Sequence, residues 1–372
     1  MNSKKIPDMW LFGLAIAFLA IGIFMVYDAS YARAGQVSYT GGDSSFFVKR
    51  QALFAMIGVI FMFIAMRIKY WKLKNMGFIL LLFSIIGLAL VFVPGIGVLV
   101  NGARRWIHLG PITIQPSEFT KLGLVIYLAA LLAEKQHEIR DIKKGLLPAL
   151  WPLLLIGALI MKQPDMGTTI VLTMAALVMI YMAGARSKHL IVVILVGLVL
   201  GSALIFSSPY RTARITNFIN PFDDYHGGGY QVCQSLIALG SGGLFGVGLC
   251  EGREKLFYLP AEHTDFILAT LGEEMGFIGT AALALLFLMF AVRGFRIASN
   301  TKDGFGKLLA AGLSALITGQ ALLNMLVVTS SVPATGVPLP FISYGGSSLA
   351  LNLLSVGILL NISMYPTTRG AQ

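Results

Sequence analysis

Apolar runs of roughly 17 to 25 residues recur along the whole chain, separated by polar connections, and this is the length at which a helix spans a bilayer. Helices of a soluble protein would instead alternate apolar stripes with charged faces. The pattern therefore predicts an all-α polytopic membrane protein of about ten transmembrane helices. The predicted spans are Met9 to Tyr27, Gln51 to Met66, Met76 to Val93, Glu118 to Leu132, Leu146 to Met161, Thr168 to Ala185, His189 to Ser207, Thr264 to Val292, Leu308 to Val328 and Ser348 to Met364.

The composition supports a membrane protein. Of the 372 residues, 56% are hydrophobic and only 12% are charged, and the mean hydropathy is +0.80. Because the apolar residues far exceed what a soluble core of this size needs, we exclude a soluble protein. We expect a single integral membrane domain over residues 1–372, with one large extracytoplasmic loop, residues 208–263, between spans seven and eight. The formal charge of +11 fits either anchoring to anionic lipid headgroups or an anionic substrate at the outer face.

Basic residues lie in alternate connections, which the positive-inside rule places in the cytoplasm. Because Lys4 and Lys5 precede the first span and no small-residue cleavage site follows it, this span is expected to be a retained anchor. An even number of spans then puts both termini on the cytoplasmic side of the cytoplasmic (inner) membrane. The basic connections hold Arg67, Lys69, Lys72 and Lys74; Lys135, Arg140, Lys143 and Lys144; Arg186 and Lys188; and Arg293, Arg296, Lys302 and Lys307.

The external connection between spans three and four holds two polar groups, Arg104–Trp106 and Gln115–Ser117. Tryptophan is typical of membrane interfaces. Ser117 is expected to be the N-cap of the next helix, and Glu118 suits the positive helix end. Lys121 follows Glu118 by three residues on the same face, so the two can pair. This pair either neutralises itself so that a charged turn can enter the membrane, or forms one wall of a site.

The large loop contains a second helical pattern. Residues Tyr230 to Leu249 are predicted to form an interfacial or re-entrant amphipathic helix followed by a glycine turn. The run GSGGLFGVG follows no predicted strand and lacks the Gly-Lys-Ser/Thr ending of a nucleotide loop. No nucleic-acid partner is expected. Cys233 and Cys250 either form one disulfide, which an external compartment permits, or are two packed thiols.

The loop ends by delivering Asp265 to the start of span eight. Pro260 stops any preceding helix, and Thr264 is expected to cap the next one, with Asp265 in its first turn. Asp265 is either an ordinary charge at a helix start or a functional acid, because an acid at the membrane edge is costly unless something uses it. Two more irregular turns, residues 162–167 and 331–346, are expected on this side. Three small residues should form a groove beside it: Ala269, Gly272 and Gly276.

Five motifs follow one another in the chain: QPSEFTKL, QPDMGT, YQVCQSLIALGSGGLFGVGL, KLFYLPAEHTDFILATLGEEMGFIG and TGVPLPFISYGGSSL. In this order they resemble the SEDS (shape, elongation, division and sporulation) family of peptidoglycan glycosyltransferases over about Trp10 to Ser363. YLPAEHTDFI is more similar to the division branch, FtsW, than to the elongation branch, RodA. The chain departs from the family pattern at Ala261 and Glu262. The resemblance implies an extracytoplasmic cavity in which lipid II is polymerised.

The resemblance also implies roles for single residues. Asp265 matches the family's essential aspartate, and it is predicted to be the catalytic base or a ligand of a divalent cation, Mg or Mn. Glu118 and Lys121 match a pair near the cavity. The predicted substrate-binding residues are Glu118, Lys121, Arg105, Gln115 and Ser343, and other external basic residues, Arg104, Arg211 and Arg214, are candidate partners of a pyrophosphate.

The partners implied by the resemblance are lipid II, a class B penicillin-binding protein transpeptidase and other membrane proteins of the divisome. The expected location is the division septum. Three alternatives remain: an elongation-type (RodA) polymerase, a division scaffold, and a lipid II flippase or carrier. A carrier needs charges near the bilayer midplane, and only Glu273 and Glu274, two to three turns into their span, support it.

Overall fold

The computed structural model describes residues 6–36, 40–100, 102–109, 112–206, 209–256 and 258–365. Lys4, Lys5 and the side chain of Arg211 lie outside this description. The helices are α1 (Met9–Ala34), α2 (Phe46–Arg67), α3 (Lys72–Leu90), α4 (Pro116–Glu134), the π-helix η2 (Ile142–Leu146), α5 (Leu147–Lys162), α6 (Met166–Met182), α7 (Ser187–Phe206), α8 (Pro209–Ile219), α9 (Tyr230–Gly242), α10 (Ile267–Asn300), α11 (Gly304–Val328) and α12 (Gly346–Ser363).

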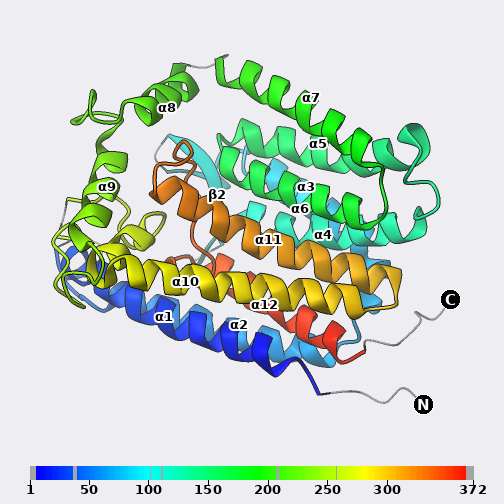
Figure 1. Ribbon diagram of the computed structural model, residues 1–372, viewed down its shortest axis with the longest axis horizontal. Coiled ribbons are helices and arrows are strands. Elements are labelled where there is room, and N and C mark those ends of the chain that lie inside the picture. The colour runs from blue at the N-terminus through cyan, green and yellow to red at the C-terminus, as the bar shows by residue number, and fades with distance from the viewer. Residues whose placement is uncertain are drawn as a thin grey trace.

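Each predicted span coincides with a helix, so the all-α polytopic fold is confirmed (Figure 1). Eight stretches of the described chain are long and apolar enough to cross a membrane, and α6 and α7 add two shorter apolar helices. In the apolar windows of α11 and α12, 78% of the residues are buried, against 22% in α3. The bundle is therefore built around α11, α12 and α4, while α3 and α7 lie at its periphery.

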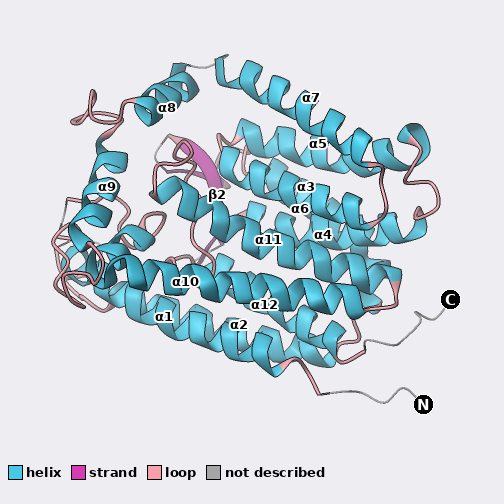
Figure 2. Ribbon diagram, in the orientation of Figure 1, coloured by secondary structure: helices cyan, strands magenta, loops and turns pink. Residues whose placement is uncertain are grey.

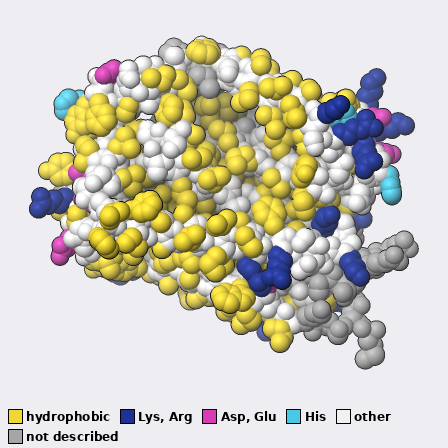
Figure 3. All heavy atoms as spheres, in the orientation of Figure 1, with side chains coloured by type: hydrophobic (Ala, Val, Ile, Leu, Met, Phe, Trp, Pro, Cys, Tyr) yellow, Lys and Arg dark blue, Asp and Glu magenta, His cyan; other side chains and the backbone are white. Residues whose placement is uncertain are grey.

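Contacts between distant residues define one end of the bundle. The Asp8 carboxylate pairs with Arg293 at 2.6 Å, and the Asp8 backbone N–H donates to the Ser363 hydroxyl at 3.0 Å. The start of α1 and the ends of α10 and α12 therefore meet. In the space-filling view, Lys and Arg side chains gather mainly at the same end (Figure 3). This grouping matches the connections predicted to be cytoplasmic.

The opposite end carries a small antiparallel sheet that sequence analysis missed (Figure 2). Its strands are β1 (Gly97–Val100), β2 (Ala103–Leu109) and β3 (Ile112–Ile114), in the order β1-β2-β3. Gly102, between β1 and β2, has φ +75°. The Asn-Gly pair at 101–102 is a strong hairpin signal and could have predicted this turn.

The pattern from Thr264 to Val292 predicted one continuous span, but helix α10 is broken. At Gly276 the backbone adopts φ 64° and ψ −163°, which essentially only glycine tolerates. A methyl group on Gly272 would lie 3.2 Å from the Thr280 side chain, although eight residues of straight helix rise about 12 Å. The helix therefore turns sharply at Gly276.

The loop after α9 satisfies the backbone groups that this break leaves without helical partners. The N–H groups of Val247 and Gly248 donate to the carbonyls of Glu273 and Glu274, at 3.0 and 3.1 Å. In return, Phe277 N–H donates to the Gly243 carbonyl at 2.9 Å. Backbone polar groups at membrane depth need such partners because lipid supplies none. The predicted helix followed by a glycine turn is thus confirmed.

The side chains of Glu273 and Glu274 bind the loop that follows. Glu273 accepts from the Arg253 backbone N–H at 2.7 Å, and Glu274 pairs with Lys255. The Lys255 ammonium also contacts Asp28 of α1 at 2.6 Å. Both glutamates are buried, with at most 2% of their surface exposed. They therefore tie α1, the loop and α10 together.

The two cysteines are not bridged. Cys233 is buried in α9, and Cys250 is exposed in the loop that follows. Both are free thiols, so the disulfide alternative is wrong.

Candidate functional site

Asp265 lies in a tight turn just before α10. The helix starts at Ile267 with Phe266 as its N-cap, so the predictions that Thr264 caps it and that Asp265 occupies its first turn were wrong. Ala261 sets the turn with a left-handed φ of 58°, and its carbonyl accepts from the N–H groups of Thr264 and Phe266. Because these bonds satisfy the turn locally, the helix begins later than the capping pattern predicted.

Three successive carbonyls of this turn are held by α11 and the irregular loop 331–345. The Tyr344 N–H donates to the His263 carbonyl at 2.8 Å, the Ser343 hydroxyl to the Thr264 carbonyl at 2.6 Å, and the Asn324 amide to the Asp265 carbonyl at 2.8 Å. The turn is therefore fixed by residues about 60 to 80 positions away in the sequence. The half-buried carboxylate lies beside loop 331–345, because a methyl group on Gly336 would be 3.5 Å from Asp265 Oδ2.

The electrostatic surroundings of Asp265 suit a proton acceptor. Burial and repulsion from Asp165 raise the pKa of Asp265 from 3.8 to about 6, against the opposing attraction of Arg105, Arg214 and His263. The carboxylate is therefore mostly ionised at neutral pH but holds a proton more readily than an ordinary aspartate. General bases work best when their pKa lies near the working pH.

The neighbouring charges sit on separate elements. Arg105 of β2 donates to the carbonyls of Gln163, at 2.9 Å, and Pro164. Asp165, in the turn that also contains Gln163 and Pro164, caps α6 by accepting a hydrogen bond from the Thr168 N–H at 3.0 Å. Arg214 of α8 donates to the carbonyl of residue 334 at 2.8 Å. The sheet, the turn 162–167, α8 and the loop 331–345 therefore meet around Asp265, as expected of the external turns.

The predicted pair of Glu118 and Lys121 is present, with Lys121 Nζ 2.9 Å from the carboxylate. Both side chains are 5% exposed, so the pair is buried. Lys121 Nζ also donates to the Gln320 amide oxygen at 2.7 Å, and Gln320 donates to the Pro338 carbonyl at 2.9 Å. The pair is thus connected to loop 331–345 through α11.

The start of α4 differs from its prediction. The helix begins at Pro116, so Gln115 occupies the N-cap position and Ser117 lies inside the first turn. The Ser117 hydroxyl is buried and has no hydrogen-bond partner among the described residues. Proline at the first helical position is common because its missing N–H would be unsatisfied anyway. Ser117 is therefore not the N-cap.

The predicted groove of small residues does not open next to Asp265. A methyl group on Gly272 would collide with Leu239 of α9, and one on Gly276 would collide with the backbone of residues 244–246. The space is filled by α9 and its glycine loop. The prediction was wrong because Asp265 lies before the start of α10, so helical spacing does not align it with these positions, and because α9 and its loop pack against Gly272 and Gly276.

The described residues contain no group of three or more His, Cys, Asp or Glu side chains placed to hold a metal ion. Near Asp265, Asp165 supplies a further carboxylate. Mg²⁺ in phosphate-handling sites is commonly held by one or two protein carboxylates together with substrate phosphates and water. The donors present fit a cation that is shared with a pyrophosphate, and the divalent cation stays a prediction.

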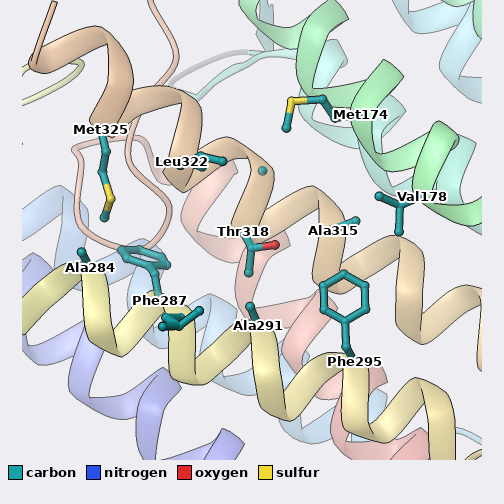
Figure 4. A pocket seen from close by; sticks show the side chains of 12 residues that line it. Met174, Val178, Ala284, Phe287, Ala291, Phe295, Ala315, Thr318, Leu322 and Met325 are labelled. Carbon is teal, nitrogen blue, oxygen red and sulfur yellow. The ribbon is translucent and has the colours of Figure 1, made fainter. Parts of the chain in front are cut away.

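A separate cavity of about 390 Å³ lies between α6, α10 and α11 (Figure 4). Its lining is apolar apart from Thr318, and it contains no titratable side chain. Met325, at one end of the lining, directly follows Asn324, which contacts the Asp265 turn. No local sequence pattern marks this cavity, so it was not predicted.

A model of the cell cycle protein family named for FtsW, RodA and SpoVE matches residues 8–368. Stage V sporulation protein E of Bacillus subtilis (strain 168) is 46% identical over 98% of this chain and 99% of its own length. A probable peptidoglycan glycosyltransferase FtsW of Trichlorobacter lovleyi is 44% identical over 96% of this chain and 93% of its own length.

Solved structures share the fold. One chain comes from a structure described as "Structural coordination of polymerization and crosslinking by a peptidoglycan synthase complex". It aligns with a TM-score of 0.80 and 27% identity, over 97% of this chain and 98% of that chain. The rod shape determining protein RodA of Thermus thermophilus aligns with a TM-score of 0.71 and 28% identity, over the same shares.

Proposed function

Because the chain belongs to the cell cycle protein family of FtsW, RodA and SpoVE, we propose that it is a peptidoglycan glycosyltransferase that polymerises lipid II at the outer face of the cytoplasmic membrane. The observation that carries this proposal is the environment of the Asp265 carboxylate. Its pKa is raised to about 6, and the basic residues Arg105 and Arg214 lie close enough to affect it. A base beside cationic groups is what glycosyl transfer from a pyrophosphate donor requires.

In the proposed reaction, the Asp265 carboxylate takes the proton of the acceptor hydroxyl. The hydroxyl oxygen forms a bond to the anomeric carbon of the donor, and the bond from that carbon to the pyrophosphate oxygen breaks. The leaving polyprenyl pyrophosphate keeps the electron pair of the broken bond, so negative charge develops on its terminal phosphate oxygen. Arg105 and Arg214 would stabilise this charge as it develops.

The pair of Glu118 and Lys121 is proposed to support the site from the side of α4. Its lysine is already engaged by Glu118 and Gln320, at 2.9 and 2.7 Å. An ammonium group has three donors, so one stays available for a substrate oxygen. Gln115, at the outer end of the same helix, is proposed to bind the substrate headgroup.

A divalent cation would neutralise the charge of the leaving pyrophosphate. As the alternative to its role as the base, we propose that Asp265, with Asp165 nearby, would hold this cation together with the substrate phosphates. The apolar cavity between α6, α10 and α11 is a candidate site for part of the polyprenyl chain, because its apolar lining extends to the residue next to Asn324.

A class B penicillin-binding protein is the proposed partner, since a structural relative comes from a peptidoglycan synthase complex that couples polymerisation to crosslinking. We place the enzyme at the division septum with both termini in the cytoplasm. Relatives named FtsW and a relative named for sporulation are similarly close, at 44% and 46% identity. Depletion in growing cells tests the division role: filaments without septa support it, and normal division with failed sporulation contradicts it.

The test of the activity is polymerisation of lipid II by the purified protein, alone and with its transpeptidase, with and without Mg²⁺ or Mn²⁺. Asp265→Asn keeps the side-chain shape but removes the base, and it should lower the rate by at least about 100-fold. Asp223→Asn, an exposed acid of the same long loop, is the matched control and should leave the rate unchanged. A folded Asp265→Asn protein that polymerises normally would exclude the proposed base.

The carrier alternative loses its sequence support in the structure. Glu273 and Glu274 are not lining a path, because their carboxylates bind the loop 250–255. If wild-type protein makes no polymer but still binds lipid II, flipping in vesicles becomes the discriminating assay between a carrier and a scaffold.

A further inference from the structure

Helix α11 carries two buried amides one turn apart, Gln320 and Asn324, each 1% exposed. At a separation of four residues they lie on the same helix face. Gln320 connects Lys121 to the Pro338 carbonyl. Asn324 donates from one nitrogen to the carbonyls of Asp265 and Val337, at 2.8 Å each. One side chain therefore joins the Asp265 turn to the loop that faces it.

The orientation of the Asn324 amide follows from its partners. Two carbonyl oxygens can only be met by the NH₂ group, so Nδ2 must face them. The Asn324 Oδ1 is buried and has no hydrogen-bond partner among the described residues. A buried acceptor without a partner is unfavourable. The residue is thus arranged for its two donated bonds, at a cost to the stability of the fold.

The bonded carbonyls belong to the two walls around the Asp265 carboxylate. Val337 follows Gly336, whose added methyl group would come within 3.5 Å of Asp265 Oδ2. The Ser343 hydroxyl fixes the adjacent Thr264 carbonyl and accepts from the Leu339 N–H, at 2.6 and 2.8 Å. Its single proton is already donated, which leaves it poorly suited to bind substrate. Asn324 and Ser343 therefore hold the backbone on either side of the Asp265 carboxylate.

We propose that Asn324, assisted by Ser343, is a positioning residue that sets the direction of the Asp265 carboxylate relative to loop 331–345. This inference rests on the proposed role of Asp265 as the base. Misplacement of a reacting group by about 1 Å can slow a reaction on the order of 100-fold without changing substrate affinity. Loss of Asn324 should therefore lower kcat and leave KM nearly unchanged.

The chain offers a matched control for Asn324. Asn361 of α12 is also 1% exposed and also joins two backbone groups, the Tyr70 N–H at 3.0 Å and the Met66 carbonyl at 2.7 Å. It lies at the opposite end of the bundle. Asn324→Leu and Asn361→Leu each remove a buried amide that makes two hydrogen bonds, so they should lower Tm to a similar extent. Only Asn324→Leu should lower kcat.

The experiment measures kcat, KM for lipid II, and Tm for the full-length wild type, Asn324→Leu and Asn361→Leu. We expect kcat of Asn324→Leu to fall on the order of 100-fold per folded molecule, with kcat of the control within about twofold of wild type. If Asn324→Leu does not fold, Ser343→Ala removes only a hydroxyl, and the inference predicts a smaller fall in kcat with the same KM.

Three results would overturn the inference. Asn324→Leu could keep its kcat, it could lose activity only in proportion to folded protein as Asn361→Leu does, or KM could rise while kcat stays constant. For Ser343→Ala, a raised KM with normal kcat would instead indicate substrate binding. Asp265→Asn in the same assay separates the two proposals. If Asp265→Asn remains active, the proposed base is wrong, whereas an inactive Asp265→Asn beside a normal Asn324→Leu rejects only the positioning role.

Discussion

The pH dependence of the reaction is the most direct readout of the environment of Asp265. Burial and the nearby Asp165 carboxylate raise the pKa of Asp265 to about 6, while Arg105, Arg214 and His263 act in the opposite direction. As a base, Asp265 must be unprotonated. The rate of polymerisation should therefore be nearly independent of pH above 7 and fall about tenfold per pH unit below 6. At pH 5 it should be about one tenth of the plateau.

Asp165→Asn changes this profile in a known direction. Removing a negative charge near Asp265 makes its ionised form easier to keep, so the pKa of Asp265 falls and the acid limb moves to lower pH. The substitution should preserve the fold, because asparagine is as good an N-cap as aspartate and can still accept from the Thr168 N–H. The predicted shift is thus separable from damage to α6.

The assay is the initial rate of glycan formation from lipid II between pH 5 and 8, with Tm measured at each pH for both proteins. An acid limb that stays in place, or moves to higher pH, in a folded Asp165→Asn protein would refute the assigned source of the shift. A wild-type rate that does not decline below pH 6 would refute the role of Asp265 as the titrating base.

Further predictions concern stability, pairing and topology. Since the folded pKa of Asp265 is raised from 3.8 to about 6, its contribution to stability is present below pH 4 and is lost as pH rises through 6. Asp265→Asn should therefore be more stable than wild type at pH 7, by about 1 to 3 kcal/mol in denaturant unfolding, and an equal or lower stability contradicts this. Glu118→Lys and Lys121→Glu should each lose activity. If the pair, 2.9 Å apart, is structural, the double variant that exchanges the two residues should regain it. Continued inactivity of the folded double variant favours a direct role in substrate binding. Gly276→Ala should lower the free energy of unfolding by at least about 2 kcal/mol, because φ is 64° at this position and the added methyl group would lie 2.4 Å from Gly246 N. The control Gly197→Ala, with open space around it, should be neutral or stabilising. Equal Tm values for the two variants would argue against the break in α10. Lys143→Cys should resist a membrane-impermeant thiol reagent in intact cells and Arg104→Cys should react, and the reverse pattern would invert the topology.

The interactions that sequence analysis predicted correctly depend on residues close together in the chain. The run of apolar residues from Met76 to Val93 is long enough to cross a bilayer by itself, and α3 forms there, from Lys72 to Leu90. Glu118 and Lys121 meet because three residues of helix bring them to one face. The start of α10 shows the limit of this reasoning. Thr264 looked like a cap, yet the turn made by Ala261 delays the helix to Ile267.

The sequence alone determined the class of the protein, the positions of its spans and the likeness of Asp265 to the family's aspartate, because span length and motif order are local properties. Tertiary structure decided what surrounds that aspartate. Arg105 comes from a sheet, Arg214 from α8 and Asn324 from α11, and their distances to Asp265 depend on how these elements pack. Electrostatic interaction and hydrogen bonding depend on separation in space. Separation in space is set by the fold rather than by position in the chain.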